Sequence, residues 1–217
     1  MNEADTYLTE SEAAAFYAAG DTAHDFDHVL RVAHLAGQIA AAEGADAAVV
    51  RLAALLHDVP VHADAVAGRR DHHLAAADFA RTLLLARGLA PERTANVVHC
   101  IEAHRFRDRS RTPQTLEARC LYDADKLDSM GAIGVARAFA FAGAHAARLW
   151  REPWTAVPGD AAMPAGADYT PVHEFAYKLQ RLLATLHTPT ARAIGAERHR
   201  VLVAFFDQLD AEMLGLA

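Results

Sequence analysis

Four short segments of the chain carry histidine and aspartate at spacings that suit a metal ion. They are, in chain order, His28-x-x-Arg31, His57-Asp58, His99 to His104, and Asp125-Lys126. Imidazole and carboxylate groups are the ligands that Mn, Fe, Co and Zn accept at neutral pH. Two histidines and two aspartates would leave a divalent ion formally neutral, with positions open for water and a substrate oxygen. A metal centre is therefore one interpretation of these segments.

The adjacent pair His57-Asp58 is the most informative segment. It lies at the end of an apolar helix that Asp46 caps and that Val59-Pro60 ends. A buried carboxylate beside a histidine costs free energy unless it has a partner, and an ion would satisfy both groups. Neighbouring residues of a helix point about 100° apart, so both can reach one ion only near the helix end. A hydrogen-bonded histidine in the core remains the alternative from the residues alone.

Helices must position these side chains, because the chain is rich in Ala and Leu and has few β-branched runs. A capping box at Thr9 and Glu12 predicts a first short helix, and a second is expected over about 24–43. Pro113 is expected to open a sixth helix, and helix is expected again from Leu127 to about Trp150. Further helix-start signals are Asp46, Asp71, Pro91, Thr170-Pro171 and Thr188-Pro189.

We predict a single all-α domain of about eight or nine helices over residues 1–217. Its core is expected over about 20–150 and its C-terminal helices over 170–217. Residues 151–169 contain three prolines and two glycines, so they cannot form a regular helix. So long an irregular segment favours a functional flap, although packing of its aromatic residues against the last helices is the simpler expectation.

The composition excludes several classes of protein. With 21 Lys and Arg against 28 Asp and Glu, the net charge is −7. This balance argues against a nucleic-acid polymer as partner and leaves a small anionic ligand open. No apolar stretch predicts a membrane-spanning helix, and the polar N-terminus does not match a signal peptide. The two cysteines, Cys100 and Cys120, form no closely spaced pair, so we expect neither a thiolate zinc site nor a disulfide framework, and a cytoplasmic location.

The order and surroundings of these segments resemble the HD-domain metal-dependent phosphohydrolase superfamily. The match comprises His28-x-x-Arg31-Val32, His57-Asp58 and Ala124-Asp125-Lys126-Leu127-Asp128. The runs 123–128, 131–137 and 188–200, with Lys178-Leu179, also resemble a small bacterial nucleotide pyrophosphohydrolase-like subgroup. The resemblance therefore extends over nearly the whole chain.

The resemblance implies a metal-dependent phosphohydrolase, with an HD-type helical bundle, that acts on a nucleotide or a related phosphorylated small molecule. The subgroup implies release of pyrophosphate from nucleoside triphosphates. The implied divalent ion is Mn, Fe, Co, Zn or Mg, with manganese among the candidates. The implied metal ligands are His28, His57, Asp58 and Asp125. The residues expected to serve catalysis or substrate contact are Asp58, Arg31, Lys126 and His104.

Two alternatives stay open. A di-iron oxygenase of the same superfamily would need both His73 and His104 as ligands, whereas a non-catalytic binding module would use the metal for stability alone. Family members often carry an acidic residue or a lysine soon after the His-Asp pair. Here His62 or Asp64 would have to take that role. The general base, the exact substrate and the oligomeric state, with a homodimer as one option, are not determined.

Overall fold

The protein is described by a computed structural model that covers residues 3–17, 26–60, 72–105, 111–157, 164 and 166–216. These residues form nine α-helices, four 3-10 helices and no strand, which confirms the predicted all-α fold. The α-helices are α1 (Glu10–Tyr17), α2 (Phe26–Glu43), α3 (Ala47–Leu56), α4 (His72–Ala86), α5 (Pro91–Ala103), α6 (Leu116–Leu127), α7 (Gly131–Ala144), α8 (Pro171–Tyr177) and α9 (Pro189–Met213). The 3-10 helices are η1 (Glu3–Thr6), η4 (Trp154–Ala156), η5 (Gly166–Asp168) and η6 (Leu179–Thr185).

The chain packs into two compact units, which are treated separately. Unit 1 comprises Met1–Asp125 and His187–Ala191, and unit 2 comprises Lys126–Leu186 and Arg192–Ala217. The sequence-based division into one domain with a core, a flap and C-terminal helices stays a prediction. All the predicted metal ligands belong to unit 1.

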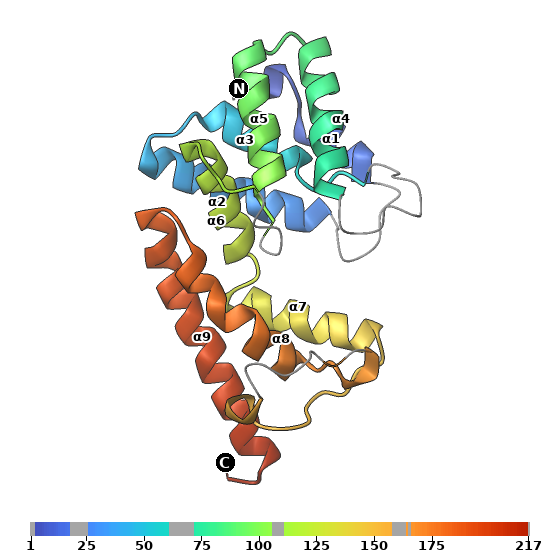
Figure 1. Ribbon diagram of the computed structural model, residues 1–217, viewed down its shortest axis with the longest axis vertical. Coiled ribbons are helices and arrows are strands. Elements are labelled where there is room, and N and C mark those ends of the chain that lie inside the picture. The colour runs from blue at the N-terminus through green and yellow to red at the C-terminus, as the bar shows by residue number, and fades with distance from the viewer. Residues whose placement is uncertain are drawn as a thin grey trace. The chain divides into compact units, whose positions relative to one another are not determined.

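Helix α3 is the central element of unit 1. It contacts α1, α2, α4, α5 and η1 (Figure 1). Only Ala47 and Arg51 among its ten residues escape burial. A helix that is apolar on every side is stable only when other elements surround it. The end of α3 is therefore a rigid place from which to present His57 and Asp58.

Local side-chain caps fix where helices α1 and α3 of unit 1 begin. At α1, the Thr9 N–H donates to Glu12 Oε2 at 2.9 Å and the Glu12 N–H donates to Thr9 Oγ1 at 3.3 Å, which confirms the capping box. At α3, Asp46 Oδ1 accepts from the backbone N–H groups of Ala48 and Val49. These bonds satisfy donors that the first turn of a helix leaves open.

A buried carboxylate, Asp123 of α6, anchors the start of α9 within unit 1. Its oxygens accept from the His187 N–H at 2.8 Å and from the N–H and hydroxyl of Thr188, each at 2.7 Å. Burial raises the pKa of Asp123 even though these hydrogen bonds act in the opposite direction. Thr188 in turn caps α9 by accepting from the Ala191 N–H, as the sequence predicted. Helix α6 is thereby held in a fixed register.

Three predicted helix boundaries are wrong. The sixth helix begins at Leu116 rather than at Pro113, because the Thr115 hydroxyl accepts from the Ala118 N–H and caps it there. The following helix begins at Gly131 rather than at Leu127, and it ends at Ala144 rather than near Trp150. Ala146 has a φ of 50°, and the Ala147 N–H turns back to the Ala142 carbonyl at 2.9 Å. A left-handed residue of this kind ends a helix, but it is usually glycine, so this helix end could not be predicted from the residue type.

In unit 2, the described part of the irregular segment 151–169 packs on the last helices. The Trp154 ring meets Phe175 edge-on, with centroids 5.3 Å apart. Its indole N–H donates to Asp207 at 2.8 Å, and its backbone N–H donates to Asp210. The expected packing role of this aromatic residue is therefore confirmed.

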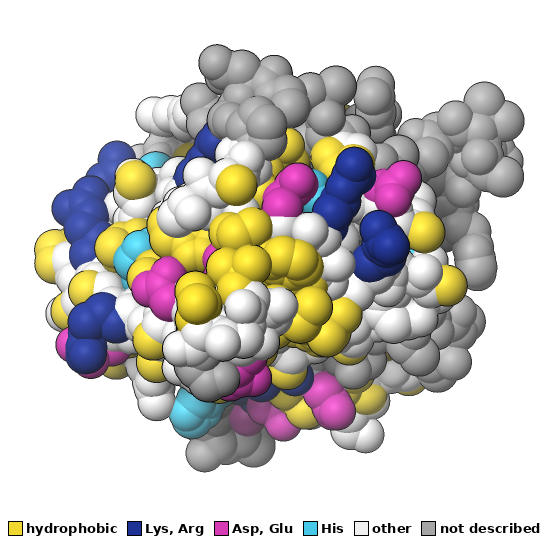
Figure 2. Space-filling view, turned by 90° about the horizontal axis from the view of Figure 1, so that it is seen from below, with side chains coloured by type: hydrophobic (Ala, Val, Ile, Leu, Met, Phe, Trp, Pro, Cys, Tyr) yellow, Lys and Arg dark blue, Asp and Glu magenta, His cyan; other side chains and the backbone are white. Residues whose placement is uncertain are grey.

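Unit 2 also exposes large hydrophobic side chains. Figure 2 shows the molecule from below the view of Figure 1, and hydrophobic side chains are gathered on this surface. Among the described residues of unit 2, the exposed large hydrophobic side chains are Phe141, Leu149, Val201, Phe205, Met213, Leu214 and Leu216. Within the described ranges, no helix is both long and apolar enough to cross a membrane.

The close approach of Gly134 to the preceding turn yields a stability test. A Cβ atom at Gly134 would lie 2.3 Å from the Ser129 carbonyl oxygen, whereas a Cβ at Gly143 of the same helix would meet nothing within 4 Å. We expect Gly134→Ala to lower the free energy of unfolding by about 1–3 kcal/mol, as overpacking does. Gly143→Ala should be neutral or stabilise by up to about 1 kcal/mol. Urea denaturation measures both, and equal stability of the two variants would contradict this packing.

Candidate metal centre

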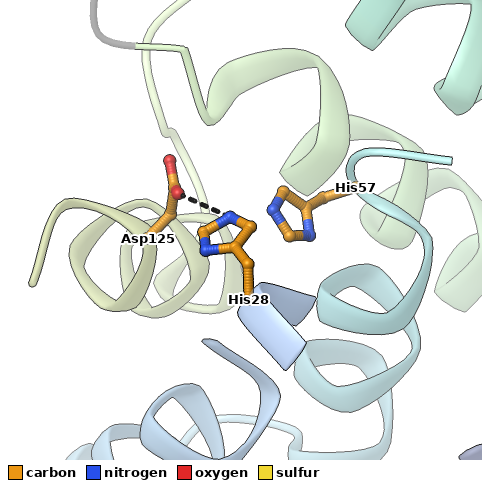
Figure 3. Close-up of side chains that lie close together, drawn as sticks. All are labelled: His28, His57 and Asp125. Carbon is orange, nitrogen blue, oxygen red and sulfur yellow. Dashed lines mark ion pairs between the residues drawn. The ribbon is translucent and has the colours of Figure 1, made fainter. Parts of the chain in front are cut away.

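Three helices of unit 1 bring the predicted ligands together. His28 lies in the first turns of α2, His57 and Asp58 follow the last residue of α3, and Asp125 lies near the end of α6. One ligand atom from each of His28, His57 and Asp125 lies within 4.8 Å of the other two, so this group could hold a metal ion. The three side chains lie next to one another in Figure 3. Their convergence agrees with the set that the sequence singled out.

Asp58 lies beside both imidazoles. Its Oδ2 atom is 3.5 Å from His57 Nε2 and 3.9 Å from His28 Nε2. His28 Nε2 is also 3.5 Å from Asp125 Oδ1, the ion pair drawn in Figure 3. The structure therefore gathers all four predicted ligands, and their coordination of an ion stays a prediction.

The end of α3 lets two adjacent residues face one site. His57 is the C-cap residue, directly after Leu56, and Asp58 lies in the turn beyond it. His57 Nδ1 lies 2.7 Å from the Ala54 carbonyl oxygen and therefore donates to it. This bond fixes the ring and the tautomer, which leaves Nε2 as the unprotonated nitrogen.

His57 is suited to metal binding by its charge state as well as its orientation. The residue is fully buried, and this burial lowers its pKa to about 4, although the neighbouring carboxylate of Asp58 acts in the opposite direction. The imidazole is therefore neutral at pH 7, as a metal ligand must be. Among the described residues, no group makes a hydrogen bond to His57 Nε2. His57 Nε2 is thus a buried hydrogen-bond acceptor that lies close to two carboxylates. A divalent cation would bind this nitrogen and the carboxylates together.

His104 is held in the same way at the end of α5. It is the C-cap residue of that helix, and its Nδ1 lies 2.7 Å from the Ile101 carbonyl oxygen. Its Nε2 is 3.5 Å from Asp58 Oδ1, the oxygen that does not face His57. Asp58 thus lies between two imidazoles, each of which is oriented by a hydrogen bond to the carbonyl three residues earlier. The structure brings His104 to the cluster, and its catalytic role stays a prediction.

Other candidate residues have mixed outcomes. His73 is fully buried on α4, with its ring 6.3 Å from that of His104. His99 instead accepts from the Gln114 N–H at 3.0 Å, which is a structural contact. Arg137 pairs with the buried Asp128 at 2.8 Å in unit 2. His62 and Asp64 lie outside the described residues.

Arg31 and Lys126, two of the residues expected to serve catalysis or substrate contact, lie on the same helices as the ligands. Arg31 is half-buried on α2, one turn beyond His28. Lys126 is buried and follows Asp125 in α6. Their contact with a substrate stays a prediction.

Sequence reasoning missed Tyr17 of α1. Its side chain is buried, and its hydroxyl donates to the Leu55 carbonyl at 3.0 Å, two residues before His57. Burial raises the pKa of Tyr17 well above its usual value, and the nearby charge of Asp58 adds to this, so the hydroxyl stays protonated. A tyrosine at the end of a short helix is indistinguishable in the sequence from an ordinary core residue.

Comparison with known proteins agrees with this site. The family model of the HD domain matches residues 25–130, which include every predicted ligand. YpgQ, an uncharacterized protein of Bacillus subtilis, is 35% identical over 198 residues, which cover 89% of this chain and 86% of YpgQ. The chain therefore belongs to the HD-domain phosphohydrolase superfamily.

Solved structures show the same fold. The crystal structure of Bacillus subtilis YpgQ in complex with ADP has a TM-score of 0.72 at 30% identity and covers 96% of this chain and 94% of that one. An HD-superfamily hydrolase from Bacillus thuringiensis has a TM-score of 0.70 at 26% identity, with 96% of each chain covered. A Lactobacillus plantarum protein has a TM-score of 0.76 at 27% identity, with 99% of each covered.

Replacement of Asp58 tests whether this cluster binds metal. Asp58→Ala removes one carboxylate and makes the formal charge of the site more positive by one. Metal affinity should fall by more than the roughly 10–100-fold that loss of an outer partner costs. The helical circular dichroism should stay unchanged, because apolar packing of α3 does not depend on Asp58. Isothermal titration with Mn²⁺ and Co²⁺ measures the affinity.

Asp78→Ala is the control, since that side chain is 80% exposed on α4. It should bind metal as the wild type does. Unchanged affinity in Asp58→Ala would mean that the pair with His57 is an ordinary polar contact of the core. Loss of both fold and binding would favour a structural metal site.

Proposed function

We propose that the protein is a metal-dependent phosphohydrolase that acts on a nucleotide or a related phosphorylated small molecule. The specific reaction proposed is release of pyrophosphate from nucleoside triphosphates. The observation that carries the proposal is the convergence of His28, His57 and Asp125, with Asp58 beside them, in a buried part of unit 1. Manganese is the first candidate among Mn, Fe, Co, Zn and Mg.

We assign the residues of the cluster separate roles in metal binding and in phosphate binding. His28 and His57 would hold the ion as neutral ligands, and Asp58 and Asp125 would balance its charge. A bound divalent ion supplies a water of lowered pKa and polarises a phosphoryl oxygen. Burial strengthens these charge interactions relative to water. The cations of Arg31 and Lys126 are proposed to bind the phosphate oxygens, where negative charge develops during hydrolysis.

The nucleotide part of the proposal has separate support. The Bacillus subtilis relative was crystallised in complex with ADP, and its structure covers almost all of this chain. The net charge of −7 also fits a small anion bound at local cations better than a nucleic-acid polymer. A small phosphorylated molecule is therefore the partner we propose. A homodimer and a cytoplasmic location stay predictions.

A substrate and metal screen tests this function. Nucleoside mono-, di- and triphosphates are incubated with Mn²⁺, Co²⁺, Mg²⁺, Zn²⁺ or Fe²⁺, and both phosphate and pyrophosphate are measured. We expect pyrophosphate from triphosphates with at least one metal. Asp125→Ala should lower turnover by orders of magnitude, whereas Asp78→Ala should leave it unchanged. Metal binding without turnover of any phosphate, together with a lower melting temperature after chelation, would identify a non-catalytic metal-stabilised module instead.

One observation favours a second candidate, the di-iron oxygenase. Asp58 offers one oxygen to His57 and the other to His104, and His73 lies next to His104. In such a site His73 and His104, with Asp58, would hold a second ion, which that chemistry requires. A single bound ion would leave His104 as a contact for the substrate.

The number of metals per chain separates these candidates. Elemental analysis of the purified protein should give about one ion per chain for the hydrolase with a single metal. About two irons per chain, reduced to about one by His104→Ala, together with dioxygen uptake, would favour the oxygenase. His99→Ala is the control, because His99 makes a structural hydrogen bond to Gln114 and should not alter the metal content.

A further inference from the structure

The carbonyl groups at the end of α3 have an unusual set of partners. In a continuing helix the Leu55 carbonyl would accept from the N–H of Val59, four residues later. Here the Val59 N–H is directed instead to the Leu56 carbonyl at 3.4 Å. The Leu55 carbonyl accepts from the Tyr17 hydroxyl at 3.0 Å. A side chain from α1 thus replaces a helical donor at the point where α3 ends.

The position of this replacement matters for the metal centre. His57 directly follows α3 and keeps helical backbone angles, with φ −62° and ψ −32°. At this helix end, His57 Nε2 lies 3.5 Å from Asp58 Oδ2. The placement of the pair therefore depends on how firmly the end of α3 is held.

Tyr17 also contacts the second helix that supplies a ligand. Its ring lies 5.4 Å, between centroids, from that of Phe26. Phe26 is the first residue of α2 and lies two residues before His28. The hydroxyl of Tyr17 is thus bound to the end of α3, while its ring packs on the start of α2.

We propose that Tyr17 is a positioning residue for the metal centre. Its hydroxyl binds the Leu55 carbonyl, which the end of α3 leaves without a helical donor, and so holds His57 and Asp58 in place, while its ring packs on the start of the helix that carries His28. Tyr17 itself does not bind the ion. The effect on metal binding rests on the proposed metal-dependent function. The stability of the end of α3 can be measured without a metal.

The test compares two variants that each remove one buried hydroxyl. Tyr17→Phe removes the donor to the Leu55 carbonyl and keeps the ring. Thr94→Val is the matched control, because the buried Thr94 hydroxyl of α5 donates to the Leu89 carbonyl at 3.3 Å in the same unit. Both variants keep the shape of the side chain, so a general loss of stability should affect them equally.

Two measurements are made on each variant. Amide hydrogen exchange of the metal-free protein reports on residues 57–59, and Co²⁺ titration gives an affinity and a visible absorption spectrum that reports ligand geometry. In Tyr17→Phe we expect exchange at 57–59 to be at least about tenfold faster than in Thr94→Val, relative to global stability. We expect Co²⁺ affinity to fall about 10–100-fold, with an altered spectrum, as when other partners that orient a metal ligand are lost.

The outcomes separate this inference from the proposed function. Wild-type exchange rates at 57–59 in Tyr17→Phe would overturn the inference. Faster exchange with an unchanged Co²⁺ affinity and spectrum would also overturn it, because the helix end would then not position the ligands. If the wild type binds no metal, the proposed function fails, and exchange at 57–59 still decides whether Tyr17 holds the end of α3 in place.

Discussion

Placing two adjacent polar side chains at the buried end of α3 is the constraint on which the rest of unit 1 depends. His57 is fully buried, and Asp58 is nearly so. Groups of this kind are costly in an apolar interior unless they find partners. The fold supplies such partners. Helix α3 is apolar and packed on all sides, and a hydrogen bond to the backbone fixes His57. Two further helices bring His28 and Asp125 to the same place.

Polar contacts remote from the cluster keep those helices in register. Asp123 lies two residues before Asp125, and it binds the backbone and hydroxyl of the segment that starts α9. Because its bonds are made to one short segment, α6 cannot slide or rotate without breaking them. The Tyr17 hydroxyl makes a comparable hydrogen bond at the end of α3, to the Leu55 carbonyl. The centre is thus held by bonds on its supporting helices as well as by contacts among the ligands.

His57 and His104, which both follow the end of a helix, are oriented by the same kind of hydrogen bond. In His57 and His104 the Nδ1 atom is bound to the carbonyl three residues earlier, which directs Nε2 toward Asp58. This geometry is compatible with the proposed hydrolase with one ion, and also with a site in which His104 and Asp58 would help to hold a second ion. The number of ions therefore decides which chemistry the arrangement supports.

The sequence by itself determined the helical class, most helix starts and the identity of the residues that converge. Capping residues such as Thr9, Asp46 and Thr188 act within a few residues of the chain, so their effect could be predicted locally. The end of α7 could not, because an alanine there adopts a backbone conformation that usually belongs to glycine. Only the tertiary structure decided that His104 meets Asp58 and that the Tyr17 hydroxyl binds the Leu55 carbonyl, since each contact joins residues at least 38 positions apart and depends on how the helices pack.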